Sequence, residues 1–353
     1  MLELFRPEVQ ALVAYHTPAV PGADKLNENE WPTDLPDAFK QKLAQTLEQE
    51  ILANRYPSAN PERLKAGIAD YCGVTPSHVA LGNGSDELIR AIITATCVGG
   101  QGAVLSAEPT FSMYRILAET FGVPYVGLER RENDFSFDPD TLRDAVRKHH
   151  VRVVFLANPN SPTATLLSEQ ILETLRSLPV ITVLDEAYFE FSGFTSVPLI
   201  ETWPNLIILR TFSKAFRLAS FRVGYAIAQS EVAQLLEKVR LPYNLSAISQ
   251  AAATLAIENR DVLLAEVPAL LQGRHRLVES LSPWLRIWPS AANFFYARCP
   301  NWDLETLRLA LAEQGSLIRV TGGGMRISVG TPAQNQRLID NFARVLGKAS
   351  NSN

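Results

Sequence analysis

The sequence predicts an α/β protein with a mostly parallel sheet flanked by helices, followed by a smaller α+β domain. Short apolar strands alternate with helical segments between residues 79 and 210, which is typical of a sheet covered on both faces. After residue 245, two long helical stretches precede a few short strands. The 353 residues also exceed the usual size of one hydrophobic core. We therefore expect an N-terminal arm at 1–35, a large domain at 36–245 and a small domain at 246–353, with the arm joining the small domain and covering the functional site.

The elements follow from local patterns along the chain. The arm contains four prolines, a fifth follows at Pro36, and there is little periodicity, so we expect the arm to be irregular. A helix is expected at 36–53, because Phe39, Leu43, Leu47 and Ile51 share one helical face, and a second at 61–71. The expected strands of the large domain are Val79–Leu81, Ala103–Leu105, Val151–Ala157, Val180–Leu184 and Leu206–Leu209, with helices at 85–96 and 114–121 between them. The small domain is expected to hold helices at 246–258, 261–281 and 332–346, and short strands at 287, 294–296 and 327–329.

Composition excludes several classes of function. The net charge of −4 and the pI of about 5.8 lack the basic footprint of a nucleic-acid binder. No apolar run is long enough to span a membrane, and the N-terminus does not resemble a secretion signal. Cys72, Cys97 and Cys299 are odd in number and far apart, which favours a reducing, cytoplasmic location. Neither they nor the five histidines form a metal-binding pattern, so we expect no metal.

Polar side chains follow four of the apolar strands at the point where each strand ends. The segments are Gly82–Ser85, Asn158–Thr163, Asp185–Tyr188 and Arg210–Lys214. Ligands of open α/β sheets bind at the carboxyl ends of the strands, so these segments are expected to line one site. Their convergence is more informative than any one of them.

The Gly82–Ser85 turn opens a helix, and the free N–H groups there suit a phosphate. A plain helix cap is the commoner explanation of such a turn. Asp86 and Glu87 in the first helical turn would repel an anion if they pointed toward it. The segment is neither a Walker motif nor a complete GxGxxG motif.

Three further strand-end residues have a chemical and an ordinary interpretation. Lys214 can form a Schiff base if it is desolvated, although most lysines are simply exposed. The carboxylate of Asp185 ends an apolar strand and needs a cation or hydrogen-bond donors, which a protonated ring nitrogen or an ordinary arginine would provide. Tyr188 can reach the same ligand or belong to the core. Arg222 can bind a phosphate bidentately or pair with a surface carboxylate.

Two arginines near the C-terminus are expected to face each other. If residues 316–328 form a hairpin around a four-residue loop, Arg319 lies opposite Arg326 and Val320 lies opposite Met325. Like charges directly opposite are destabilising, and an anion held between the two guanidinium groups would relieve the repulsion. A slip of one residue would instead place the arginines on opposite faces.

The chain resembles the fold-type I pyridoxal-phosphate aminotransferases, and among them the histidinol-phosphate aminotransferase branch. The resemblance covers nearly the whole chain, and the most specific match is TFSKAF. The matching segments, in order, are Lys25–Glu30 with Pro32, Asn54–Pro57 (NRYP), Gly84–Glu87 (GSDE), Pro109–Tyr114 (PTFSMY), Asn158–Thr163 (NPNSPT), Asp185–Tyr188 with Phe191, Thr211–Phe216 (TFSKAF) and Arg326–Thr331 (RISVGT).

The resemblance implies a pyridoxal 5′-phosphate cofactor and a role for each matching residue. Lys214 would hold the cofactor as a Schiff base and move the proton between substrate Cα and cofactor C4′. Asp185 would keep the ring nitrogen protonated, so that the ring accepts electrons. Asn158 and Tyr188 would bond the phenolic oxygen, and Phe111 would stack on the ring. The residues implied to surround the cofactor phosphate are Gly84, Ser85, Ser213 and Arg222, with Thr211 nearby and Asp86 counted among the cofactor-binding residues.

The resemblance also implies the substrates and a partner. Arg319 and Arg326 would bind the phosphate of histidinol phosphate and, in turn, a carboxylate of glutamate or 2-oxoglutarate. Tyr15 and Asn29 would close over the site. The family tyrosine that matches Tyr56 reaches the cofactor phosphate of a second subunit, which implies a homodimer. The reaction implied is exchange of an amino group between histidinol phosphate and 2-oxoglutarate in histidine biosynthesis.

Four residues depart from the family pattern. Arg217, Ser220 and Ala164 stand where glycine is common, and Trp31 stands where asparagine is common. These departures remove no cofactor-binding group, and they affect mainly which amino donor the protein is expected to use. The alternatives are therefore an aromatic amino acid aminotransferase, with Arg326 on the carboxylate, or a threonine-phosphate decarboxylase. A pyridoxal-phosphate-binding DNA regulator is disfavoured by the short acidic arm, and a dehydrogenase by the incomplete GxGxxG.

Overall fold

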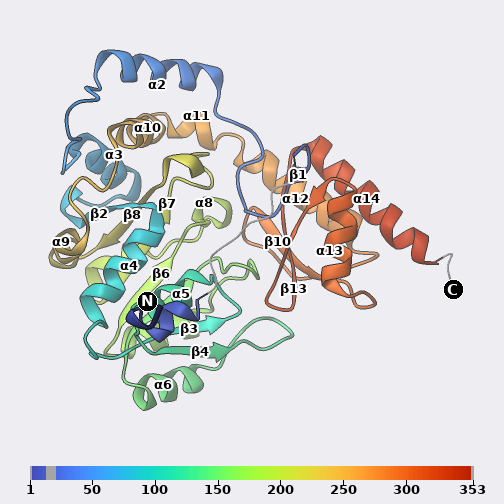
Figure 1. Ribbon diagram of the computed structural model, residues 1–353, viewed down its shortest axis with the longest axis horizontal. Helices are drawn as coiled ribbons and strands as arrows, with labels where there is room; N and C mark the ends of the chain where they lie inside the picture. The colour runs from blue at the N-terminus through green and yellow to red at the C-terminus, as the bar shows by residue number, and fades with distance from the viewer. Residues whose placement is uncertain (1, 13–20, 351–353) are drawn as a thin grey trace.

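The protein contains a seven-stranded and a four-stranded sheet, each with its own helices. The computed structural model describes residues 2–12 and 21–350, and Figure 1 shows the two sheets side by side, with α12, α13 and α14 beside the smaller one. The α/β fold class with a mostly parallel large sheet is confirmed. No helix within the described ranges has the length and apolar character that a membrane span requires.

The large sheet has the strand order β2-β8-β7-β6-β5-β3-β4. Its strands are β2 (Val79–Asn83), β3 (Ala103–Glu108), β4 (Tyr125–Glu129), β5 (Val151–Ala157), β6 (Ile181–Asp185), β7 (Leu206–Thr211) and β8 (Val223–Ala228). The central pairs β3–β5, β5–β6 and β6–β7 are parallel, and β8 runs antiparallel to both of its neighbours. The carboxyl ends of β5, β6 and β7 therefore meet at one edge.

Both faces of this sheet are covered, which explains the continuous apolar runs in its strands. In β5, Val154 and Leu156 pack into one core cluster, whereas Val153 and Phe155 pack into another on the opposite face. The helices around the sheet are α2 (Asp37–Gln49), α3 (Glu62–Cys72), α4 (Gly84–Thr96), α5 (Met113–Thr120), α6 (Pro139–Lys148), α7 (Glu169–Ser177), α8 (Phe189–Ser192), α9 (Ser230–Val239), α10 (Ala247–Glu258) and α11 (Arg260–Leu264). Short 3-10 helices are η2 (Pro76–His78), η3 (Val197–Thr202) and η4 (Ala219–Phe221).

The small sheet has the order β12-β13-β10-β9 and is antiparallel. Its strands are β9 (Arg286–Ile287), β10 (Phe294–Arg298), β12 (Arg319–Thr321) and β13 (Gly324–Ser328), and its helices are α12 (Val267–Leu281), α13 (Leu304–Glu313) and α14 (Pro332–Ser350). Alternate residues divide between its faces. Phe295 and Ile327 pack into the core with the helices, whereas Phe294, Tyr296 and Arg326 lie on the other face.

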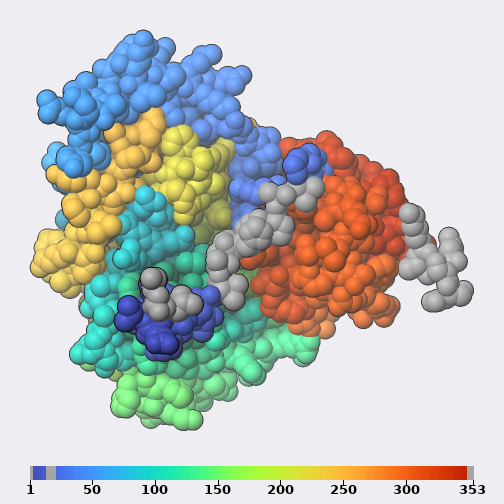
Figure 2. Space-filling model, in the orientation of Figure 1, coloured from blue at the N-terminus to red at the C-terminus, as the bar shows by residue number. Residues whose placement is uncertain are grey.

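The N-terminal arm touches both units. It contains η1 (Leu2–Leu4), α1 (Pro7–Gln10) and β1 (Asp24–Lys25). Helix α1, dark blue in Figure 2, lies on the large unit against α5, and the guanidinium of Arg6 donates to Thr120 O. Strand β1 pairs in parallel with β11 (Ser316–Leu317), and Leu26 packs into the small-unit core. The expected irregular arm thus contains a short helix and a two-residue strand.

The packing of α10 and α11 bears on where the large domain ends. Helix α10 packs against α3 and α2, and its Ala253 and Ile257 belong to the same core as the large sheet. At Gly67 of α3, an added Cβ would lie 2.6 Å from Ile257 Cγ2, so the two helices approach closely. Leu263 of α11 belongs to this core too. We propose that the large domain extends through α11, to 264, instead of ending at 245.

Candidate functional site

A cavity of about 110 Å³ lies at the carboxyl ends of the parallel strands. Side chains that follow β5, β6 and β7 meet residues from the start of α4 and from the segment before α5. The lining residues are Ser85, Asp86, Phe111, Ala157, Ser161, Asp185, Ala187, Tyr188, Thr211, Ser213, Lys214 and Arg222. Nine of the residues singled out from the sequence are therefore gathered around one space. Within 2–12 and 21–350, no cluster of His, Cys, Asp or Glu could hold a metal ion.

Asp185 is the buried carboxylate at the centre of this cavity. Its Oδ2 accepts from the Tyr114 hydroxyl at 2.9 Å, and its Oδ1 accepts from Ala187 N at 3.1 Å. Burial raises the pKa of Asp185 to about 6, and the nearby Asp86 also raises it, while the two hydrogen bonds and Lys214 act in the opposite direction. The two donors thus only partly compensate the charge, and a cationic partner in the cavity would stabilise it further.

Lys214 follows β7 and its amine points toward the arm. Its Nζ donates to Glu28 O at 3.1 Å and lies 5.6 Å from the centre of the Tyr188 ring. The Tyr188 hydroxyl accepts from Asn29 Nδ2 at 2.9 Å. Amine, phenol and carboxylate thus face the same space, which is the arrangement that amine chemistry with an adjacent proton acceptor requires.

Asn158, directly after β5, presents an unused hydrogen-bond donor. Its Oδ1 accepts from Leu167 N at 2.9 Å, whereas its buried Nδ2 has no partner among the described residues. A buried NH₂ group without an acceptor is costly, so an acceptor oxygen on a ligand would satisfy it. Phe111 lines the same cavity and packs edge-on against Tyr114, with ring centres 5.6 Å apart.

The start of α4 forms a narrow cradle with β8. A Cβ added at Gly84 would lie 2.5 Å from Arg222 Nη2, and one added at Gly224 would lie 2.5 Å from Ser85 N. Gly84 also has φ +71°, which favours glycine. Arg222 Nη1 reaches Ser213 Oγ at 3.5 Å, and Ser213 N donates to Thr211 Oγ1 at 3.1 Å. Backbone amides, hydroxyls and a guanidinium thus surround a space suited to an anion.

Asp86 places an acidic side chain beside this cradle. Its Oδ2 pairs with Arg222 Nη2 at 3.1 Å. Burial raises the pKa of the Asp86 carboxyl, while Arg222 and Lys214 lower it. The repulsion of an anion expected from the sequence is therefore reduced, because Arg222 lies beside this carboxylate.

The arginine hairpin is formed by β12 and β13. Arg319 is the Cα partner of Arg326 and Val320 that of Met325, which confirms the predicted register. The loop is shorter than expected, because Thr321 pairs with Gly324 and only Gly322 and Gly323, both with positive φ, form the turn. Glu28 Oε1 lies 3.3 Å from Arg319 Nη1 and already offsets part of the repulsion between the arginines.

The arm and the large unit also hold Arg326. Its Nη1 donates to Ser161 Oγ at 3.0 Å and its Nη2 donates to Asn27 O at 2.6 Å. The hairpin turn is fixed by Tyr296, whose hydroxyl lies 2.8 Å from Thr321 O and 2.7 Å from Gly322 O. The two guanidinium groups therefore have defined positions on the small sheet beside the cavity.

Comparisons with known proteins agree with this geometry. The family model described as "Aminotransferase class I and II" matches residues 24–342. The chain belongs to this family. A histidinol-phosphate aminotransferase of Gloeobacter violaceus is 59% identical over 97% of this chain and 98% of its own length. A Synechococcus protein of the same name is 47% identical over 98% and 99% of the two chains.

Two solved structures show the same fold in proteins with that name. The Sinorhizobium meliloti histidinol-phosphate aminotransferase, in complex with pyridoxal-5′-phosphate, is 25% identical, with a TM-score of 0.85 over 98% of each chain. A putative histidinol-phosphate aminotransferase from Erwinia carotovora atroseptica is 26% identical, with a TM-score of 0.85 over 95% of this chain and 99% of its own.

Asn29 and Tyr56, both chosen from the sequence, are among the residues that do not line the cavity. Asn29 is buried and bridges Tyr188 and Ser328, whose hydroxyl donates to Asn29 Oδ1 at 3.0 Å. Tyr56 is 82% exposed and stacks on Tyr243, with ring centres 4.6 Å apart. Tyr15 lies outside the described residues.

Sequence reasoning gave no role to several residues that the structure places at the site. Tyr114 was quoted only as part of a motif, yet its hydroxyl donates to Asp185. The signal was available, since a tyrosine on the apolar face of a helix needs a partner for its hydroxyl. Glu28 and Ser161 also belonged to quoted motifs, and both contact the arginine hairpin. Tyr296 had no such signal, because its role depends on the fold of the small sheet.

The raised pKa of Asp185 predicts a pH dependence of stability in the cofactor-free protein. Because the folded state holds the proton more tightly than the unfolded state, folding is favoured more at pH 4 than at pH 7. As pH rises from about 4 to about 7, we expect the free energy of unfolding to fall by about 2 kcal/mol on account of this one group. Urea unfolding at stepped pH, compared with Asp185→Asn, isolates this contribution.

Asp303→Asn serves as the control. Its backbone hydrogen bond from Thr306 lowers the pKa of the Asp303 carboxyl, so this variant should leave the decline between pH 4 and 6 intact. A wild-type protein whose stability followed that of Asp185→Asn across the whole range would contradict the assignment.

Proposed function

We propose that this aminotransferase exchanges the amino group of L-histidinol phosphate with the keto group of 2-oxoglutarate, using pyridoxal 5′-phosphate. One observation carries the proposal: a buried carboxylate and an amine line one cavity, and two opposed arginines lie beside it, one of them bonded to the lining residue Ser161. Similarity of 59% and 47% to relatives named for this activity supports the choice of substrate. The same cavity and hairpin would serve both halves of the reaction.

The residues around the cavity fit the cofactor group by group. Asp185 offers a partly compensated negative charge to a protonated ring nitrogen, and the free Asn158 Nδ2 offers a donor to the phenolic oxygen. Phe111 offers a ring face, and the Gly84–Arg222 cradle offers donors to a phosphate. When bound, pyridoxal phosphate supplies a carbonyl for amines and a conjugated ring that accepts electrons from the substrate Cα.

Lys214 is placed to act as base and acid beside this ring. Its amine would take the proton from the substrate Cα and return it at cofactor C4′, since no other lysine among the described residues lines the cavity. The contact with Glu28 O and the neighbouring Tyr188 ring restrict where the amine can move. Tyr188 would hydrogen-bond the phenolic oxygen, with its own hydroxyl held by Asn29.

Arg319 and Arg326 would bind the anionic end of each substrate. Histidinol phosphate presents a phosphate and 2-oxoglutarate a carboxylate, and both anions can bridge two guanidinium groups. Glu28, which lies beside Arg319 in the structure, would move away as the anion binds. Because the same pair meets both substrates, the hairpin does not need to rearrange between the half-reactions.

Other donors remain as alternatives with less support. An aromatic amino acid would use Arg326 for its carboxylate and would leave Arg319 without a substrate anion. The L-threonine-O-3-phosphate decarboxylase of Porphyromonas gingivalis has a TM-score of 0.78 at 21% identity, which shows a shared fold alone. The named relatives at 44–59% identity favour histidinol phosphate over both.

A half-reaction titration tests the donor. Without a keto acid, histidinol phosphate should convert the bound cofactor to its amine form at far lower concentration than phenylalanine or tyrosine, as followed by absorbance. Arg326→Ala should raise the concentration of histidinol phosphate for half-conversion about a hundredfold, because a charge-assisted contact is lost. The exposed Arg286→Ala on β9 is the matched control and should behave as wild type.

If the aromatic amino acids converted the cofactor preferentially, they would be the amino donors, and the proposed cofactor chemistry would still hold. If Arg326→Ala were saturated by histidinol phosphate at the same concentration as wild type, the hairpin would not be the site that binds the substrate anion. The choice of donor and the role of the hairpin are therefore tested independently.

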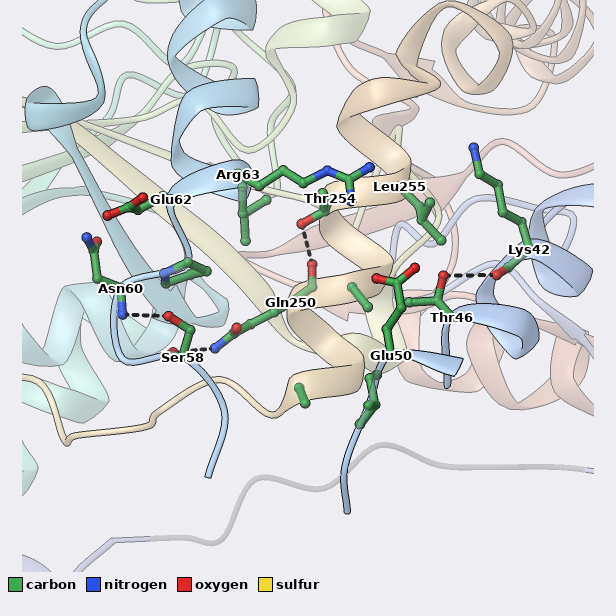
Figure 3. Close-up of a pocket in the computed structure, with 15 residues that line it drawn as sticks. Lys42, Thr46, Glu50, Ser58, Asn60, Glu62, Arg63, Gln250, Thr254 and Leu255 are labelled. Atoms are coloured by element: carbon green, nitrogen blue, oxygen red, sulfur yellow. Dashed lines mark hydrogen bonds between the residues drawn. The ribbon is translucent and has the colours of Figure 1, made fainter. Parts of the chain in front are cut away.

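We also propose that the protein forms a homodimer in which Tyr56 serves the neighbouring site. In its own subunit Tyr56 is exposed, as are Leu47 and Leu52 nearby. Close to them along the chain, Thr46 and Ser58 line a groove between α2, α3 and α10, which Gln250 also lines (Figure 3). Exposed apolar side chains beside a groove are typical of an interaction surface, and a second copy of this chain would cover them.

Mixing two inactive variants tests the shared site. Lys214→Ala and Tyr56→Ala are each expected to lack most activity. After joint unfolding and refolding in equal amounts, a dimer with shared sites should regain about a quarter of the wild-type sites, because half of the dimers are mixed and each contains one intact site. If Tyr56 served its own subunit, no mixed dimer would have an intact site and activity would not return.

The cysteines are the basis for a proposal about the cellular compartment. Cys72, Cys97 and Cys299 are all free thiols, and the latter two are buried. Free thiols without a disulfide framework fit a reducing environment, so we propose that the protein acts in the cytoplasm.

A further inference from the structure

Arg217, three residues after Lys214, has a backbone conformation that favours glycine. Its φ is +62°, a region that residues with a Cβ rarely adopt. Its N–H donates to Lys214 O at 3.1 Å, so the turn is part of the lysine loop. The side chain is nevertheless 4% exposed, which is unusual for arginine. Contacts of the buried guanidinium must therefore offset both the strained backbone and the lost hydration.

The guanidinium of Arg217 joins three separate parts of the chain. Its Cζ lies 4.6 Å from the centre of the Trp31 ring, and its Nη1 donates to Asp34 O at 3.4 Å, both in the arm. Its Nη2 donates to Leu263 O at 3.4 Å at the end of α11, and pairs with Glu266 Oε1 at 3.2 Å before α12. Arg217 thus points away from the cofactor cavity.

Trp31 is fixed from a second direction. Its ring is stacked with that of Phe191 in α8, with centres 6.3 Å apart and planes 21° apart, and it is 8% exposed. Its Nε1 donates to Thr33 Oγ1 at 3.1 Å. Trp31 packs in one cluster with Tyr188 and Phe191. The indole therefore anchors the arm to the segment that follows Asp185.

The arm segment before Trp31 crosses the candidate site. Asn27 O accepts from Arg326, Glu28 O accepts from Lys214, and Asn29 Nδ2 donates to Tyr188. Two of these three contacts use backbone carbonyl groups, so they depend on the path of the chain and not on side-chain identity. The position of Trp31, two residues further on, helps to set that path.

We propose that Arg217 and Trp31 form a clasp that holds residues 27–31 across the site, so that Arg217 is a positioning residue acting through the arm. That residues 27–31 cross an active site rests on the proposed function. The clasp itself rests only on the contacts described above. A desolvated guanidinium over an indole is a strong cation–π pair, and its planar shape allows stacking that an ammonium group cannot reproduce. Arg217 and Trp31 both depart from the family pattern, and each is the contact partner of the other.

Hydrogen exchange in the holoenzyme tests the clasp. We compare Arg217→Gly, Trp31→Leu and the double variant, and measure protection of backbone amides in a peptide covering 24–35. Each single change should lower protection about tenfold, as loss of a buried cation–π pair implies. The double change should lower protection by clearly less than the product of the two single fold-changes, since both remove the cation–π contact, although Arg217 also bonds Asp34 O and Trp31 also stacks on Phe191. KM for the amino donor should rise several-fold while kcat and the cofactor absorbance change little.

Two controls separate the clasp from general destabilisation. Arg217→Lys keeps the charge but should lose most of the protection. Arg286 stacks on Trp288 of the small sheet at the same 4.6 Å, and Arg286→Ala should leave the arm unaffected.

Two results of the hydrogen-exchange experiment would contradict the clasp. Because glycine relieves the positive φ, Arg217→Gly without a clasp would leave arm protection unchanged or increase it, and that would overturn the proposal. Additive effects of the two single changes would overturn it too. Hydrogen exchange requires no substrate, so a different preferred donor would refute the proposed function and leave this result intact.

Discussion

The buried carboxylate of Asp185 is the constraint on which the rest of the site depends. It ends a strand at the centre of a sheet that is covered on both faces, where a charge is poorly solvated. Tyr114 and Ala187 hold its two oxygens but leave its pKa raised. The strand order then places Lys214, Tyr188 and the α4 cradle around it, because the carboxyl ends of neighbouring parallel strands meet at one edge.

The small sheet completes the site by dividing its residues between two faces. Phe295 and Ile327 pack against α12 and α14, which leaves Arg326 facing the large unit. The Gly322–Gly323 turn brings Arg319 opposite Arg326, and Tyr296 holds the turn. The arm connects the two units, since its carbonyl groups accept from both Lys214 and Arg326. One segment of backbone thus contacts both the amine that we propose as the base and the guanidinium that we propose as the anion site.

The sequence predicted the parts of this arrangement that depend on local pattern. Continuous apolar runs identified β5 and β7 and therefore the strand ends that carry Asn158 and Lys214. The hairpin register followed from the spacing of two arginines around glycines, although the turn proved shorter. Strands β4 and β8 and helices α6, α7, α9 and α13 were not predicted. Strand β4 lies at the edge of the sheet with only Leu128 buried, so its apolar signal is weak.

Other features could not be predicted, because they arise only from tertiary packing. The acceptors for Lys214 and Arg326 in the arm are backbone carbonyl groups, which have no signature in side-chain identity. The direction of Arg217 depends on where Trp31 lies. Helix α10 was assigned to the small domain because it follows a change in pattern, yet its apolar residues pack with the large sheet.

The most direct test of this account is the affinity of the cofactor-free protein for pyridoxal phosphate in wild type and Asp185→Asn, measured by fluorescence titration near pH 7.5. If the buried carboxylate exists to pair with the ring nitrogen, the variant should bind at least about tenfold more weakly, while its cofactor-free form unfolds at the same or a higher temperature. Equal affinity in the two proteins would show that Asp185 does not hold the cofactor, and would contradict the central claim.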